Sequence, residues 1–209
     1  PDATPILQVE VETGGSPEFG DRRQVEGEDI GRADGLPGRA LGFDGLDAVV
    51  IDTSSTEALQ ALGGGRGEAL REWVRHGGHL VVGVSSRWQA VRDSVLAEML
   101  PAVPNGLAQI NDFGALETYA GSNIPVTPAG SERVSVCRLE QFEKRGGKVL
   151  DATAAMPLIV RGAFGFGRVT VLANNHDTDR FMSLDGATRD GAKLHTAFVM
   201  ATRGIPQLY

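Results

Sequence analysis

The chain has 209 residues, a hydrophobic fraction of 41% and a formal net charge of −7, so it is long enough to bury a real core. Its acidic balance argues against a nucleic-acid partner, because a phosphate backbone selects basic surfaces. No apolar run is long enough for this segment to insert into a membrane, and one cysteine excludes an intrachain disulfide.

The amino-terminal residues predict a strand followed by a long loop. Residues 6–11 alternate apolar and polar side chains, as in a half-exposed strand, and we assign 1–13 to this N-terminal strand. Residues 14–38 are polar, charged and rich in glycine, which favours a loop. We expect the core to span 40–203 within a single α/β domain that covers 1–209.

The stretch 46–88 predicts the unit around which the chain is organised: strand, helix, strand, sharp turn and helix. Two short apolar runs, 48–51 and 80–84, are typical of strands buried on both faces of a parallel sheet. Between them, apolar residues recur at helical spacing until Gly77, which supplies a left-handed helix stop. Two parallel strands joined by a crossover helix follow from this order.

Polar residues come directly after both of these strands. Asp52 follows the first strand and Ser85 follows the second. The carboxyl ends of parallel strands share one edge, where open α/β sheets bind ligands. We therefore expect a pocket at this edge, lined by Asp52 and by the residues after the turn, Ser86, Arg87 and Trp88.

The second half of the chain predicts a helix, an irregular excursion and then a change to antiparallel strands. Apolar residues on one face predict a helix over 88–100, whereas 104–130 has no clear pattern. Short runs without intervening helices must pair in antiparallel fashion. The runs are 134–139, 148–150, 157–161 and 168–172.

A glycine-rich connection and a final helix complete the prediction. Residues 162–167 lie between two strands instead of before a helix, which favours a hairpin over a phosphate-binding loop. Phe164 and Phe166 on such a tip could contact a partner. A last helix is expected to start near Ala187.

This order of elements resembles the class I glutamine amidotransferase-like domains of large bacterial envelope proteins. The phrases ALREWVRHGGHLVV (69–82) and PLIVRGAFGFGRVTVLANN (157–175) carry the resemblance, which covers roughly 40–203. It implies a three-layer, flavodoxin-like α/β fold, with a mostly parallel central sheet and an antiparallel C-terminal extension. It also implies an extracytoplasmic, envelope-associated location. Other domains of the same larger protein, or a separate protein, would then be its partners.

The resemblance also implies that the family's catalytic apparatus is altered. Active members carry a cysteine in a tight turn after a strand, and Ser85 stands at that position here. The family's histidine is matched by His176, but Thr178 occupies the position of its usual glutamate partner. The glycine pair that builds the oxyanion hole is replaced by residues from Thr53 onward. We therefore interpret the chain as a non-catalytic module that serves binding or assembly.

Two other functions remain open. A serine-dependent hydrolase would use Ser85 as nucleophile, His176 as base and Asp177 or Asp52 to orient that base. Against this, Ser85 and Ser86 could simply cap the following helix.

A small-molecule or carbohydrate-binding domain would instead present a concave site lined by Trp88, Asn175 and Asp52. No spacing of histidines and acids is diagnostic of a metal site, and nothing in the sequence predicts a cofactor. Cys137, on an alternating run, is expected to be a small buried hydrophobe instead of a nucleophile.

Overall fold

The computed structural model describes eight segments of the chain. They are residues 7–12, 25–29, 36–46, 48–53, 56–84, 86–110, 134–152 and 156–173. The final helix expected from Ala187 and most of the loop expected over 14–38 lie outside these segments.

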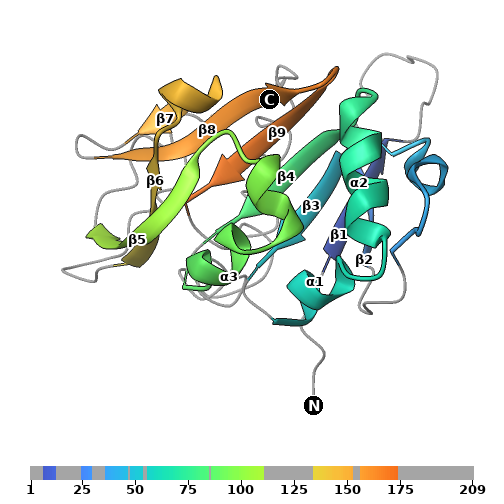
Figure 1. Cartoon of the computed structure of the whole chain (residues 1–209), viewed down its shortest axis with the longest axis horizontal. Helices are drawn as coiled ribbons and strands as arrows, with labels where there is room; N and C mark the ends of the chain where they lie inside the picture. The colour runs from blue at the N-terminus through green and yellow to red at the C-terminus, as the bar shows by residue number, and fades with distance from the viewer. Residues whose placement is uncertain are drawn as a thin grey trace.

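A mixed sheet of seven strands forms the centre of the described structure, in the order β2-β1-β3-β4-β9-β8-β7 (Figure 1). β3, β4 and β9 run parallel, and the other four neighbouring pairs are antiparallel. The strands are β1 (Leu7–Glu12), β2 (Val25–Asp29), β3 (Ala48–Asp52), β4 (His79–Gly83), β7 (Lys148–Ala152), β8 (Pro157–Phe164) and β9 (Gly167–Leu172).

The chain is therefore α/β, as the sequence predicts, but its described sheet is mixed instead of mostly parallel. Parallel neighbours need a long crossover connection. The links from β7 to β8 and from β8 to β9 are too short for one, so these strands form the expected antiparallel C-terminal extension. β1 also lies antiparallel beside β3, which removes a further parallel pairing.

The connection from β3 to β4 contains two helices, α1 (Thr56–Ala61) and α2 (Arg66–Arg75). α2 ends in a Schellman motif, in which the Gly77 and Gly78 amides donate to the Val74 and Trp73 carbonyl oxygens, each at 3.1 Å. Gly77 has a φ of +128°, a conformation that glycine adopts easily and that residues with a Cβ atom disfavour. The expected glycine stop is confirmed.

The helix expected over 88–100 is broken in two, into α3 (Trp88–Arg92) and the 3-10 helix η3 (Val95–Glu98). Ser94 lies at the break. Its hydroxyl donates to the Val91 carbonyl at 2.7 Å and accepts from the Leu96 amide at 3.2 Å. A serine that bonds the backbone in this way competes with a continuous helix and caps a new one.

A second sheet pairs two antiparallel strands, β5 (Val103–Ile110) and β6 (Val134–Glu140). β6 matches the predicted run 134–139, whereas β5 corrects the prediction that 104–110 is irregular; residues 111–130 lie outside the described segments. Gly106 has a φ of +83°, and the register shifts between Pro104 and Leu107. Such a bulge interrupts the alternation of apolar and polar residues by which a strand is recognised in a sequence.

β2 is a second correction, because it lies within the predicted loop over 14–38. Its sequence VEGED is poor in strand-forming residues, and pairing with β1 outweighs that local preference.

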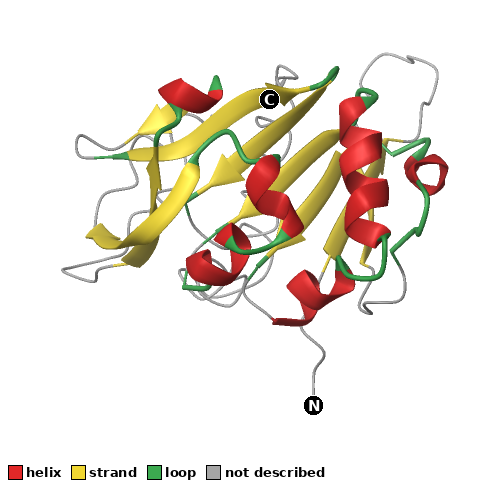
Figure 2. Ribbon diagram, viewed as in Figure 1, coloured by secondary structure: helices red, strands yellow, loops and turns green. Residues whose placement is uncertain are grey.

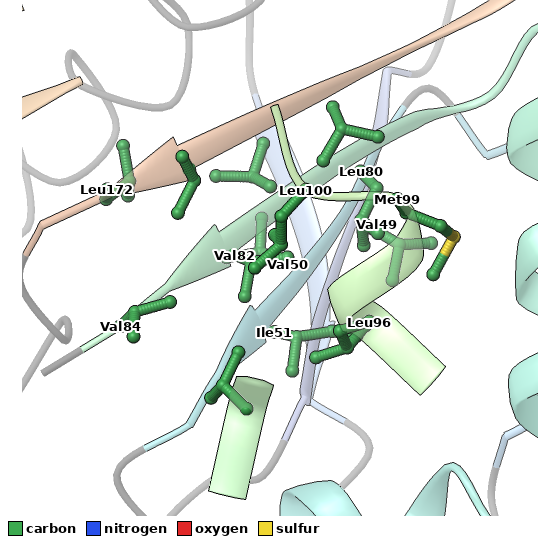
Figure 3. Close-up of a cluster of buried hydrophobic side chains, with 14 of the residues drawn as sticks. Val49, Val50, Ile51, Leu80, Val82, Val84, Leu96, Met99, Leu100 and Leu172 are labelled. Atoms are coloured by element: carbon green, nitrogen blue, oxygen red, sulfur yellow. The ribbon is translucent and has the colours of Figure 1, made fainter. Parts of the chain in front are cut away.

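The main hydrophobic core lies between the sheet and the helices (Figure 3). Leu80 and Val82 of β4 lie in register with β3 residues and pack with Leu96, Met99 and Leu100 near η3 (Figure 3). α2 and α3 lie on the same side of the sheet (Figure 2). The described residues therefore contain one helical layer, and the three-layer, flavodoxin-like arrangement is not confirmed. No described helix is both long and apolar enough to cross a membrane.

Candidate functional site

The carboxyl ends of the three parallel strands meet at one edge of the sheet, as expected from the sequence. Asp52, the last residue of β3, pairs with Gly83 of β4, and Gly83 pairs with Leu172 of β9. Neighbouring parallel strands lie about 5 Å apart, so the three chain segments that follow start close together. The backbone of Asp52 is at this edge, and its side chain lies outside the described structure.

Thr53 closes the edge between β3 and β4. Its hydroxyl donates to the Gly83 carbonyl oxygen at 2.7 Å, and its amide donates to the same oxygen at 3.4 Å. On the other side, the Val84 amide donates to the Leu172 carbonyl oxygen at 2.9 Å. Thr53 and Val84 are fully buried. The Thr53 hydroxyl therefore joins the ends of β3 and β4, a structural role that its sequence position did not reveal.

The residues predicted to line a pocket beyond β4 differ in exposure. Ser86 and Arg87 are exposed, while Trp88 is half-buried and packs against the hydrophobic core. The Arg92 guanidinium lies 5.1 Å from the centre of the Trp88 ring. The residue that caps α3 is Arg87, with no side-chain hydrogen bond, so Ser86 is not the helix cap that its sequence pattern suggests.

The predicted catalytic residues lie outside the described structure. This holds for Ser85, His176 and Asp177, and also for Asn175 of the predicted binding site. Their predicted roles stay predictions. Within the described segments, no group of three or more histidine, cysteine, aspartate or glutamate side chains is arranged to hold a metal ion.

Cys137 is a buried residue of β6, as expected from its alternating run. Its amide donates to the Ala173 carbonyl oxygen at 2.6 Å, which joins the second sheet to the end of β9. Burial is the main cause that raises the pKa of the Cys137 thiol to about 12. The group stays protonated near neutral pH, and a protonated thiol is a poor nucleophile.

Two histidines flank the end of α2 and have different surroundings. His76 is the exposed C-cap residue of α2. His79 is 2% exposed, and its Nε2 atom lies 3.0 Å from the Thr170 hydroxyl of β9. The His79 side chain therefore joins β4 to β9 inside the fold.

The hairpin between β8 and β9 is confirmed, with a two-residue turn at Gly165 and Phe166. Phe166 is 90% exposed, whereas Phe164 is half-buried. The centre of the Phe164 ring lies 5.8 Å from the Cζ atom of the Arg75 guanidinium. The Phe166 amide donates to the Arg75 carbonyl oxygen at 2.9 Å. This bond anchors the turn to the carboxyl end of α2.

An open groove of about 640 Å³ runs beside α2. Residues 38–41 form one wall, and the outward side of α2, from Glu68 to His76, forms the other. Leu41 at its rim is 78% exposed. Sequence reasoning missed this groove because its walls come from two segments whose packing no local pattern encodes.

The structure resembles two solved proteins over nearly the whole length of each. Cytoplasmic Protein STM3548 from Salmonella typhimurium matches with a TM-score of 0.55 and 16% identity, covering 94% of this chain and 95% of that one. Cytoplasmic Protein STM1381 from Salmonella typhimurium LT2 matches with a TM-score of 0.51 and 16% identity, covering 94% of both chains. These likenesses show a shared fold alone. No family model and no curated protein sequence matches the chain.

Proposed function

We propose that this chain is a non-catalytic, class I glutamine amidotransferase-like module that serves binding or assembly within a larger bacterial, envelope-associated protein. The parallel run β3-β4-β9 and the antiparallel strands β8 and β7 are compatible with that fold. The three-layer, flavodoxin-like arrangement is part of this proposal.

The position of the single cysteine is the observation that carries the proposal. Glutaminase chemistry in the family needs a thiolate at the turn that follows the strand matching β4, where this chain has Ser85. Its one thiol, on Cys137, lies in the other sheet, is buried and has a pKa near 12. A serine hydroxyl at the turn is far less nucleophilic unless a base activates it.

The described part of the strand edge also supports a binding role over a catalytic one. The Thr53 hydroxyl already donates to a backbone carbonyl, and Val84 is buried. Loss of one oxyanion donor costs about 3 kcal/mol of transition-state stabilisation in comparable enzymes. The Thr53 hydroxyl, which is engaged in the fold, is not such a donor.

Turnover assays on the full chain test the proposal. We expect no hydrolysis of glutamine or p-nitrophenyl esters above the rate shown by Ser85→Ala. The neighbouring, exposed Ser86 supplies a matched control as Ser86→Ala. Turnover that is retained in Ser86→Ala but lost in both Ser85→Ala and His176→Ala would establish the serine hydrolase instead.

A thermal-shift screen with amides, sugars and nucleotides tests the small-molecule alternative. A ligand at 100 times its Kd stabilises a folded protein by about 2.7 kcal/mol, which is a readily measured shift in Tm. A shift that disappears in Trp88→Ala would support that alternative, and no shift with any ligand class is the result expected here.

A further inference from the structure

The tip of the β8–β9 hairpin carries no polar side chain. Residues 162–167 read GAFGFG, and they lie between Arg161 on β8 and Arg168 on β9. Phe166 in the turn is 90% exposed, and Gly165 beside it is exposed as well. Exposed turns are mostly built from glycine, proline and small polar residues. A phenylalanine that protrudes from an apolar tip, with an arginine on each side, favours an interaction surface.

The backbone of the turn is fixed against the end of α2. Gly165 has a φ of +63°, and a Cβ there would come within 2.6 Å of the Arg75 carbonyl oxygen. A Cβ on Gly167 would overlap the carbonyl oxygen of Val74. The two glycines therefore allow the turn to lie directly on the helix end, where the Phe166 amide donates to the Arg75 carbonyl at 2.9 Å. Because the turn is already ordered, little conformational entropy is lost when its aromatic side chain binds.

The charged side chains around this tip are basic. Arg75 is exposed in the last turn of α2, directly beside the turn, and Arg168 is exposed at the start of β9. The described segments 73–84 and 156–173, which hold the helix end, β4, β8 and β9, contain no aspartate or glutamate. On α2 the nearest acid is Glu72, three residues before Arg75. The tip is therefore locally positive, although the whole chain has a formal net charge of −7.

The distance between the aromatic ring and the arginines matches the depth of a lipid headgroup layer. Arg168 follows Phe166 by two residues, so its backbone lies about 7 Å behind the tip at the usual rise of a strand. Peripheral segments bury their apolar side about 5–10 Å into the boundary between headgroups and acyl chains. Long arginine side chains reach from there to the phosphates. Figure 1 shows the turn beside the carboxyl end of α2, at the opposite end of the sheet from the carboxyl edge of β3, β4 and β9.

We propose that the β8–β9 tip docks the protein on an anionic lipid surface, with Phe166 at the acyl boundary and Arg75 and Arg168 at the phosphates. A lipid layer adapts to a protruding tip, and this docking needs no membrane-spanning segment. At physiological ionic strength charges more than about 8 Å from the surface are largely screened, so the cations at the tip outweigh the net charge of the chain. One ring and a few cations bind more weakly than a single acyl chain, so docking is reversible and requires millimolar lipid.

Co-sedimentation of the full chain with lipid vesicles tests the docking. We expect binding to phosphatidylcholine vesicles that contain about 30% phosphatidylglycerol, and weaker binding to phosphatidylcholine alone. Phe166→Ala should weaken binding at least about 10-fold, and Arg75→Gln should weaken binding to the anionic vesicles about 5-fold. The matched controls are Leu107→Ala and Arg138→Gln, which change exposed residues of the second sheet and should bind as the wild type does. Because Phe166 is 90% exposed, its removal should not affect folding.

A fluorescence experiment tests which part of the chain enters the lipid. Phe166→Trp places an indole at the tip, and brominated acyl chains in anionic vesicles should quench it beyond any quenching of the wild type. Leu107→Trp places the same indole on β5, in the second sheet, and should show no added quenching. Equal quenching of the two variants would overturn docking through the tip.

Three further results would overturn the proposal. The first is a folded wild-type chain that does not sediment with anionic vesicles at millimolar lipid. The second is vesicle binding that is unchanged in Phe166→Ala, because another surface must then mediate it. The third is a protein partner that binds through Phe166 while vesicles of both compositions do not, which would assign the tip to a protein interface. None of these results bears on the proposed lack of catalysis, which the turnover assays test separately.

Discussion

The contact between the β8–β9 turn and α2 predicts that Gly167→Ala destabilises the fold. An added Cβ would overlap the carbonyl oxygens of Val74 and Gly78. These are backbone atoms of a helix end and of the residue before β4, so they cannot move aside as a flexible side chain could. The turn must shift away from α2 to accept the methyl group.

The magnitude follows from the hydrogen bonds that such a shift removes. The Phe166 amide donates to the Arg75 carbonyl at 2.9 Å, and the Arg168 amide donates to the Gly78 carbonyl at 3.0 Å. Each contributes about 1 kcal/mol to the free energy of unfolding, and overpacking adds about 1–3 kcal/mol. Against this, alanine restricts the unfolded chain and contributes about 0.4–1 kcal/mol of stability. These terms together give an expected net loss of about 3 kcal/mol.

Urea denaturation followed by circular dichroism measures the effect. With a urea dependence of about 2 kcal/mol per molar, the midpoint should fall by about 1.5 M. The control is Gly38→Ala, because a Cβ at exposed Gly38 meets nothing within 4 Å, and it should be neutral or slightly stabilising. A Gly167→Ala protein as stable as Gly38→Ala would refute the account of the turn.

Three further predictions concern buried or capping groups. Thr53→Val keeps the shape of the side chain but removes the 2.7 Å bond to the Gly83 carbonyl, so urea denaturation should show a loss of about 1–2 kcal/mol. Ser94→Ala removes the cap of η3 and should cost about 1 kcal/mol in the same assay. Burial raises the pKa of the Cys137 thiol from its ordinary value of 9.0 to about 12 in the folded chain, so between pH 9 and 12 the unfolded chain loses its thiol proton first. The stability of the wild type should fall through this range relative to Cys137→Ala, and parallel pH profiles for the two proteins would count against a protonated buried thiol.

The strands and the helix stop of the central unit could be predicted because their signals are local. The apolar runs 48–51 and 80–84 lie side by side in register as β3 and β4. Gly77 ends α2 because its φ of +128° suits glycine. The close spacing after 148 leaves no room for crossover helices, and the antiparallel extension follows from that alone.

Features that depend on contacts distant in sequence could not be predicted. β2 forms from an acidic segment because β1 offers it a pairing partner. The bulge near Gly106 breaks the alternation of apolar and polar residues in β5, so the sequence pattern does not indicate a strand there. Thr53 looks like an ordinary polar residue after a strand until the Gly83 carbonyl, thirty residues later, is placed beside it. The groove beside α2 likewise depends on how residues 38–41 pack on that helix.

Covalent labelling of the native chain tests the central claim, the lack of an activated nucleophile, most directly. A fluorophosphonate reports an activated serine and iodoacetamide reports a reactive thiol, so neither needs a known substrate. Intact mass spectrometry should show no adduct with either probe on the folded protein, and one iodoacetamide adduct, on Cys137, after unfolding. A fluorophosphonate adduct on Ser85 of the folded protein, absent after prior denaturation, would contradict the account.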